Sequence, residues 1–403
     1  MYVGCLNYLS MTTTVAERPL YMGLTALVWG AGTVLGPIVG GAFASSSATW
    51  RWAFYINLVI GAVFAPAYLL LLPSIDLDAG TSFFKKLAKL DWVGTIVFIA
   101  FFLCLTMAMT FGGTLYPWNS GSEITLWVMT GVTFVLFALV TRFHPLASRQ
   151  SRLYPAHFLK MPIMVNLQIQ VALVSGTMLT TAYYLPLIYQ FSHGDSAIRA
   201  GVRLLPFIAL TVVSALLNGI FLPKTQYYTP WYFFGSILVL AGGVCMYKVT
   251  PTTSDSRLYG YSVLIGAGAG SFLQTGYAIS QAMVDVSEIP NAVGFMSVGQ
   301  DVGIVILLSV AGSIYQNKAA LGLVAALPSF SKAEIETIVA GTATPIYRSL
   351  SAADKTTVIG VIVSSINDVF GVVIAAGAIC LILSVFFGVS LCSFQGIRVV
   401  ANT

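Results

Sequence analysis

The stretch GTVLGPIVGG, Gly32–Gly41, places four glycines and a proline within an apolar run. In a helix exposed to water, each glycine costs about 1 kcal/mol relative to alanine, and a proline about 3 kcal/mol. In lipid, by contrast, small residues favour association, because they let a neighbouring helix approach closely. Gly32, Gly36 and Gly40 recur every fourth residue. They predict a smooth groove pressed against a partner helix, with a tolerated bend at Pro37.

The composition of the whole chain agrees with a lipid environment. Of its 403 residues, 57% are hydrophobic and only 8% are charged, whereas a soluble domain carries about 25% charged residues. A helix needs about 20 mostly apolar residues to cross the hydrocarbon, and only helices or closed barrels satisfy the backbone there. The apolar runs are too long and too uniform for barrel strands. They predict an all-α integral membrane protein with about ten transmembrane helices, at residues 20–44, 52–72, 92–111, 124–141, 163–190, 201–222, 230–247, 258–284, 290–316 and 369–394.

Basic residues in the short loops predict the orientation of these helices. If the N-terminus is cytoplasmic, the cytoplasmic short loops hold ten Lys and Arg residues and the outer short loops hold five. Such an excess marks the cytoplasmic side, so both chain ends are predicted to be cytoplasmic. The net charge of +5 therefore needs no nucleic-acid partner to explain it.

The segment 317–368 is predicted to be the one long polar loop, on the outer side. Within it, Ser331 followed by Glu334 forms the pattern of a helix N-terminal capping box. We expect a short surface helix there, and a second one at 351–368 that leads into the last span. The first fifteen residues are semi-apolar but too short to cross a membrane.

Asp301 is the candidate proton carrier, because it lies about eleven residues into the span 290–316. At 1.5 Å per residue this places it near the middle of the membrane, where a charge costs at least about 2.5 kcal/mol. Gly294 and Ser297 share its helix face, which favours an interior position. One interpretation is a carboxyl group that loads and releases protons. The other is a carboxylic acid hydrogen-bonded to a neighbouring helix.

Two spans carry stripes of polar side chains at helical spacing. These side chains either line a cavity for a moderately polar organic molecule or bond to neighbouring helices, at about 0.6 kcal/mol for each bond. The stripe in 163–190 consists of Asn166, Gln170, Thr177, Thr181 and Tyr184, and that in 258–284 consists of Gly270, Gln274, Tyr277 and Gln281.

Motifs for other kinds of chemistry are missing from the sequence. The run GAGAGS, Gly266–Ser271, lacks the Gly-Lys-Ser/Thr ending of a phosphate loop, so it predicts helix packing and no nucleotide site. The three histidines and five cysteines have no spacing typical of a metal site or a disulfide framework. We therefore expect no enzyme, no metal and no cofactor, with a proton gradient as the energy source.

A wider glycine pattern around the first stretch resembles the antiporter motif in the fifth helix of drug:proton antiporters of the major facilitator superfamily. The matching residues are Gly23, Gly32, Gly36, Pro37, Gly40 and Gly41. Further stretches resemble the fourteen-helix branch of that family, and especially its fungal members that export toxins and other secondary metabolites. They are ERPLYMG at 17–23, TWRWAFYINLVIGA at 49–62, LDWVGTIVF at 90–98 and SAIRAGVRLLPF at 196–207.

The resemblance implies a major facilitator fold that lacks its first four helices. Residues 1–72 are then the remnant of the N-terminal bundle, with the end of helix four and helices five and six. Residues 73–162 are two linker helices and cytoplasmic loops, and residues 163–403 are a C-terminal six-helix bundle.

The function implied is secondary active export of small organic molecules in exchange for protons, by a multi-pass protein. We expect a monomer in the plasma membrane, with a vacuolar or vesicle membrane as the alternative. Two other functions stay open, namely a siderophore transporter of the same superfamily and a truncated remnant that regulates without transporting.

Overall fold

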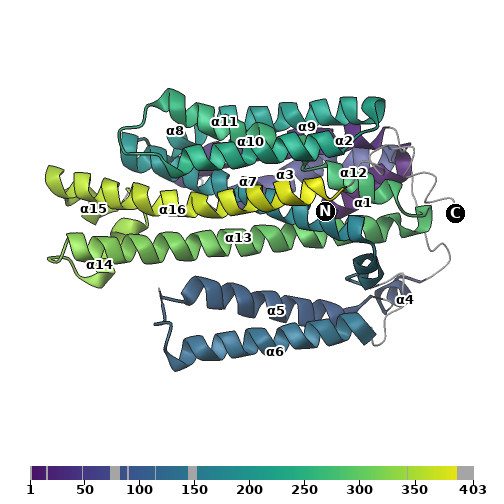
Figure 1. Ribbon diagram of the computed structural model, residues 1–403, viewed down its shortest axis with the longest axis horizontal. Coiled ribbons are helices and arrows are strands. Elements are labelled where there is room, and N and C mark those ends of the chain that lie inside the picture. Colours follow the sequence, from purple (N-terminus) through teal and green to yellow (C-terminus); the bar gives the residue numbers. More distant parts are fainter. Residues whose placement is uncertain are drawn as a thin grey trace.

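The protein is an assembly of helices in the computed structural model (Figure 1). The structure describes residues 2–14, 17–47, 49–72, 82–88, 90–113, 115–143, 152–342 and 344–387. Within these ranges it contains no strand, and only a single bridge joins Gly112 to Tyr116. The predicted all-α class is therefore confirmed.

The apolar segments of the sequence correspond to helices. Eight helical stretches among the described residues are long and apolar enough to cross a membrane, and the other two predicted spans, 20–44 and 258–284, are helical as well. The helices are α1 (Tyr2–Thr12), α2 (Arg18–Ser45), α3 (Trp52–Pro66), α4 (Phe83–Ala88), α5 (Trp92–Phe111), α6 (Gly121–Phe143), α7 (Pro162–His193), α8 (Ala197–Val202), α9 (Leu205–Thr225), α10 (Thr229–Tyr247), α11 (Asp255–Phe272), α12 (Thr275–Ala282), α13 (Ile289–Ala326), α14 (Lys332–Val339), α15 (Pro345–Ser349) and α16 (Ala352–Val385).

The helices from α7 onward form one bundle. In it, α7 packs against α13 and α16, α10 packs against α11 and α16, and α9 packs against α11. Small residues lie where the backbones meet, as packing in lipid requires. Added β-carbons at Gly266 and Gly270 would strike the carbonyl oxygens of Phe207 and Thr211 on α9. The packing role predicted for the GAGAGS run is therefore confirmed.

The segments predicted on the outer side and those predicted on the cytoplasmic side lie at opposite ends of the bundle. Figure 1 shows α8, α14 and α15 at one end, together with the turn that joins α5 to α6. All of these segments were assigned to the outer side from the basic residues. At the other end lies α4, which was assigned to the cytoplasmic side, together with α12, which forms the end of the predicted span 258–284.

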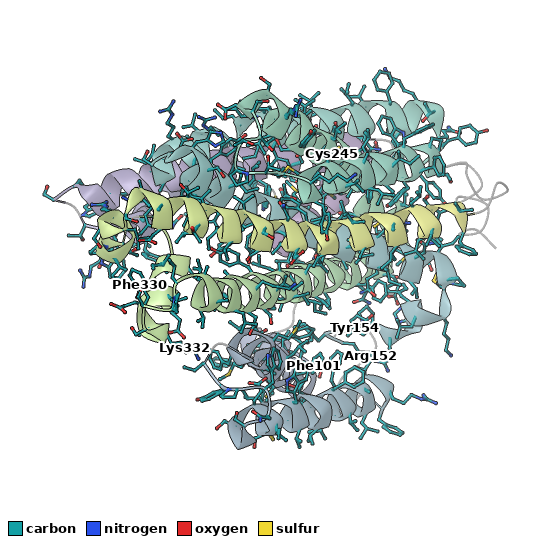
Figure 2. All side chains as sticks on the ribbon, turned by 60° about the vertical axis from the view of Figure 1, so that its left-hand side comes forward. Phe101, Arg152, Tyr154, Cys245, Phe330 and Lys332 are labelled. Carbon is teal, nitrogen blue, oxygen red and sulfur yellow. The ribbon has the colours of Figure 1, made fainter. Side chains whose placement is uncertain are left out.

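The hairpin of α5 and α6 lies along one side of the bundle, below α13 in the view of Figure 1. Asp91 caps α5 by accepting a bond from the Gly94 amide at 2.8 Å, and it also accepts one from the Leu153 amide at 3.2 Å. The Tyr154 ring lies between the hairpin and the bundle, 6.2 Å from the Phe137 ring and 5.3 Å from the Phe295 ring (Figure 2).

The last helix differs from its prediction, because α16 begins at Ala352 and not at residue 369. Ser351 caps α16. The part of α16 before residue 369 packs on the part of α13 that continues beyond the predicted end at residue 316, and there Lys318 pairs with Asp368 at 3.2 Å. Between the two helices only residues 327–351 remain, so the long polar loop predicted at 317–368 is mostly helix. The capping box of Ser331 and Glu334 is confirmed at the start of α14.

Candidate functional site

The N-terminal half of α2 packs tightly on α9, along a line of glycines. A β-carbon added to Gly23 would lie 3.0 Å from the Ala215 carbonyl oxygen. One added to Gly30 would lie 2.7 Å from the Val212 side chain, and one added to Gly219 would lie 2.6 Å from the Pro19 carbonyl oxygen. Only glycine permits an approach this close, so these residues hold α2 against the bundle.

Gly32, Gly36 and Gly40 are arranged differently from the glycines that meet α9. Around Gly32, Gly36 and Gly40, no heavy atom of the described residues lies within 4 Å of an added β-carbon. The expected groove pressed against a partner is therefore not seen in the described part of the chain. The tight α2–α9 contact ends near Gly30. Helix α2 runs unbroken through Pro37 and Gly41, whose surroundings fall outside the described residues.

An inner cavity lies between α2 and the bundle. Its volume is about 30 Å³, and its walls come from α2, α7, α9 and α13 and from the segment between α11 and α12. The lining residues are Ala26, Trp29, Gly30, Ser175, Met178, Ile208, Thr211, Val212, Leu273, Gln274, Gln300 and Ile304. About 30 Å³ is the share of a single water molecule in the liquid, so the helices must separate before an organic molecule can enter.

A break in a helix forms one wall of this cavity. Helix α11 ends at Phe272 and α12 begins at Thr275, so the regular helix is interrupted at Leu273 and Gln274, although both keep right-handed helical dihedral angles and the Leu273 amide still bonds to the Ala269 carbonyl oxygen at 3.0 Å. In a membrane, such a break is tolerated only where it is buried in protein or lines a cavity. Both residues are buried and both line the cavity. The sequence predicted one continuous span here, because a short break leaves the apolar run intact.

Hydrogen bonds tie the broken helix to its neighbours. The Tyr277 hydroxyl donates to Gln300 Oε1 of α13 at 2.6 Å and lies 3.3 Å from Ser297 Oγ. On the other side, Thr275 donates to Asn218 Oδ1 of α9 at 2.9 Å. Of the stripe predicted in 258–284, Gln274 therefore faces the cavity and Tyr277 positions a cavity residue. Gln281 is buried, and its side chain has no hydrogen-bond partner among the described residues.

The stripe predicted in 163–190 lies mostly between helices. Asn166 donates to the Leu383 carbonyl oxygen of α16 at 2.9 Å and accepts from Gln170 at 2.7 Å. Thr181 donates to the Thr177 carbonyl oxygen within α7 at 2.9 Å. None of these four residues lines the inner cavity, and Tyr184 lines a different one. For these residues, a role in binding cargo stays a prediction.

Asp301 is exposed, not buried as the sequence led us to expect. Helical periodicity could not settle this point, because Gly294 on the same face has no described heavy atom within 4 Å of an added β-carbon. Asp301 directly follows Gln300, which lines the inner cavity. Gln300 was missed by the sequence analysis, although it stands beside the one acid of that span. The role of Asp301 as a proton carrier stays a prediction.

An ionic network at the α8 end of the bundle was also missed. Arg203 pairs with Asp195 at 2.6 Å and with Asp255 at 2.5 Å, and its guanidinium lies 4.8 Å from the centre of the Tyr189 ring. His193 also reaches Asp255, at 3.1 Å. The network joins the ends of α7 and α9 to the start of α11. Asp195 follows α7 and Asp255 begins α11, and they lie far apart in the sequence, so no spacing could reveal the network.

A metal centre is not evident in the described ranges, where no three His, Cys, Asp or Glu side chains gather as ligands would. The inner cavity offers amides, hydroxyls and apolar surface, which can bind an organic molecule.

Comparison with known proteins gives matches over nearly the whole chain. Residues 1–164 match the Major Facilitator Superfamily. Efflux pump DEP3 of Fusarium langsethiae is 46% identical over 384 residues, which cover 95% of this chain and 70% of that protein. Efflux pump patC of Aspergillus clavatus is 41% identical, over 96% of this chain and 71% of that protein.

A solved bacterial homolog of the human lysosomal transporter Spinster, inward-facing and unoccupied, aligns with a TM-score of 0.48. The sequence identity is 14%, and the alignment covers 96% of this chain and 95% of that one. The identity to the fungal pumps is what establishes the family. With its membrane-spanning helices, the chain belongs to the Major Facilitator Superfamily.

Proposed function

We propose that this protein exports a small organic molecule, such as a toxin or another secondary metabolite, across a membrane in exchange for protons. Its relatives DEP3 and patC carry the name efflux pump. The observation that supports the proposal most strongly is the interruption of the helix at Leu273 and Gln274, which line a cavity between α2 and the bundle. Broken helices at the interface of two bundles hold substrate in many secondary transporters.

The mechanism proposed is alternating access around the inner cavity. The α2–α9 contact is tight from Pro19 to Gly30, and no such contact is seen around Gly32, Gly36 and Gly40 in the part of the chain that the structure describes. A rocking of α2 against α9 would open the tight end and enlarge a cavity that now has room for about one water molecule. Gln274 and Gln300 would then offer amide groups to the carbonyl or hydroxyl groups of the cargo.

Proton coupling is assigned to Asp301 in this proposal. Asp301 follows Gln300 directly in the sequence, and Gln300 Oε1 accepts a hydrogen bond from the Tyr277 hydroxyl at 2.6 Å. A change in the charge of Asp301 would therefore act next to the polar wall of the cavity. We further propose that the protein acts in the plasma membrane as a monomer, without a cofactor, a nucleic-acid partner or an enzymatic step.

The test is transport by the full chain in lipid vesicles with an imposed pH gradient. We expect the wild type to accumulate at least one fungal polyketide from a panel, in proportion to the gradient. Asp301→Asn should abolish the dependence on pH, whereas Gln274→Ala should weaken transport and leave that dependence in place. Uptake that is the same with and without the gradient would exclude proton exchange. No uptake of any compound would contradict export by this chain.

A further inference from the structure

A second, larger cavity lies at the end of the bundle that carries α14. Its volume is about 730 Å³, and its walls come from the end of α5, from α7 and α13, and from α14. It shares no lining residue with the inner cavity. Sites for small organic molecules range from about 300 to 1,000 Å³, so this cavity can hold such a molecule in the conformation seen.

Three tyrosines form an aromatic wall in this cavity. The rings of Tyr183 and Tyr184 lie 5.1 Å apart at 68°, and those of Tyr184 and Tyr315 lie 5.5 Å apart at 64°. In this edge-to-face chain, the ring of Tyr183 is the one that is open to a further aromatic group. Tyr184 and Tyr315 are almost fully buried, whereas Tyr183 is 59% exposed. Two rings are thus fixed by packing, and one stands at the opening.

Polar groups frame the aromatic wall. Ser309 and Gln316 of α13 offer a hydroxyl and an amide along the cavity. At the rim, Lys332 and Glu336 form a loose, exposed pair at 3.8 Å, so the rim carries both signs of charge and favours neither. Groups of this kind suit a neutral molecule that carries a few hydroxyl or carbonyl groups.

The covering helix α14 is held firmly in place over the cavity. The Tyr315 hydroxyl donates to the Val339 carbonyl oxygen at the end of α14, at 3.0 Å. Ile335 and Ile338 of α14 are fully buried, and the capping box of Ser331 and Glu334 closes its first turn. On this side the cavity is therefore covered by a helix that is packed and hydrogen-bonded to the rest of the bundle.

We infer that this outer cavity is a second binding site, for a planar aromatic molecule with hydroxyl or carbonyl groups. The exposed ring of Tyr183 packs on the flat face of the ligand, and Tyr184 and Tyr315 hold that ring's surroundings in place. Ser309 and Gln316 bond to the ligand's polar groups. A place for this site on an export route rests on the proposed function, but binding itself does not. Binding and transport can therefore be tested separately.

Gly312 of α13 is a position where a larger side chain can fill the cavity with little disturbance of its neighbours. A β-carbon added there would meet only the Tyr184 hydroxyl oxygen, at an ordinary contact distance of 3.9 Å. Leucine at this position would project into the cavity without displacing backbone. Gly360 of α16 is the matched control, because an added β-carbon there has no described heavy atom within 4 Å and the residue does not line the cavity.

The experiment is a fluorescence titration of 1-hydroxypyrene into the full chain in lipid nanodiscs, with empty nanodiscs as the blank. We expect saturable binding to the wild type and to Gly360→Leu. Gly312→Leu should bind at least about tenfold more weakly, and Tyr183→Ala about threefold more weakly, because an aromatic contact is lost. Tyr183 is exposed, so its variant tests the site even if Gly312→Leu fails to fold.

Two results would overturn the inference. One is the absence of saturable binding to the wild type. The other is equal affinity of Gly312→Leu and Gly360→Leu, or of Tyr183→Ala and wild type, at matched thermal stability. Either result leaves pH-driven transport untouched. Conversely, binding without transport would support this site and count against the proposed export function.

Discussion

Helices α5 and α7 are both long and apolar, yet their surroundings are opposite. The most apolar 18-residue window of the α5 segment Trp92–Phe111 has a mean hydropathy of 2.3, and 11% of that window is buried. The corresponding window of the α7 segment Pro162–His193 has a mean hydropathy of only 1.4, and 61% of it is buried. The more apolar helix is thus the less buried one, which is the reverse of the rule for a soluble protein.

The reason is that lipid is as apolar as leucine, so burial in a membrane needs fit and polar contacts more than hydrophobicity. Helix α7 supplies both, through Gly176 at its crossing with α13 and through Asn166, which bonds to α16. Helix α5 instead presents Ile96, Ile99 and Leu103, which are more than half exposed. For these two helices, contacts with neighbouring helices and not hydropathy therefore decide burial.

The largest expected effect comes from the ionic network that fixes the end of α7. Arg203→Met leaves the Asp195 carboxylate, whose side chain is 3% exposed, with only the outer Arg199 as its partner. Breaking a buried pair of this kind costs about 3 kcal/mol, so we expect a large fall in the thermal unfolding midpoint. Lys332→Met, which breaks the exposed pair with Glu336, should cost less than about 1 kcal/mol. Equal midpoints for the two variants would refute this role of the network.

The second-largest expected effect on stability comes from replacing a glycine by leucine in the buried helix α7, compared with the same change in the exposed hairpin. In Gly176→Leu, the new side chain would strike the Gly303 carbonyl oxygen, which lies 2.5 Å from an added β-carbon. Overpacking of this kind costs about 1–3 kcal/mol. In α6, the same change at Gly131 meets no described heavy atom within 4 Å and should be nearly neutral. Unfolding in detergent measures both, and a destabilised Gly131→Leu would mean that the hairpin has an unseen contact.

A smaller effect concerns the attachment of the hairpin to the bundle. Asn317 of α13 donates to the Gly112 carbonyl oxygen at 3.2 Å, just after α5 ends. Asn317→Ala removes a bond worth about 1 kcal/mol. We expect faster hydrogen exchange in the turn at 112–120, with little change at the core of α7. Unchanged exchange in the turn would show that the hairpin is held elsewhere, such as at Asp91 and Tyr154.

The smallest effect is a dependence of stability on pH. The hydrogen bond from Arg203 holds the pKa of Asp255, which lies before the predicted span 258–284, below its usual value. Its stabilising charge is then fully present above the unfolded pKa of about 3.9 and is lost as the pH falls through the lower folded pKa. The loss should stay under about 1 kcal/mol, because Asp255 is 41% exposed. Unfolding midpoints below pH 4 measure it, and Asp255→Asn should flatten the curve.

Much of the helical framework could be predicted from local sequence. The span predicted at 92–111 is α5, residue for residue, because both of its ends carry clear signals, a capping aspartate and a glycine pair. The capping box at Ser331 was found for the same reason, since it depends on residues three apart. The start of α16 was misplaced, because residues 352–368 were predicted as a separate surface helix leading into the last span and are instead the first part of one continuous helix packed against α13.

The candidate site could be predicted only in part. Gln274 was found as a polar residue in a span, and it does line the inner cavity. Sequence analysis missed Ser175, Thr211 and Gln300, because they stand on three different helices that meet only in the folded protein. Helical spacing shows which residues share a face, but it does not show which neighbour covers that face. Asn166 and Gln170 illustrate this limit, because their stripe faces α16 and not the cavity.

By itself, the sequence determined that this chain is a helical membrane protein, where most of its helices lie, and that it resembles major facilitator antiporters. These properties follow from hydropathy, caps and motifs, which act over a few neighbouring residues. The tertiary structure alone decided that α2 meets α9 before Gly32 and not along it, that Asp301 is exposed, and that the span around Gln274 is broken. Each of these depends on the shape of a partner helix far away in the chain, because close packing, and not hydrophobicity, selects contacts within lipid.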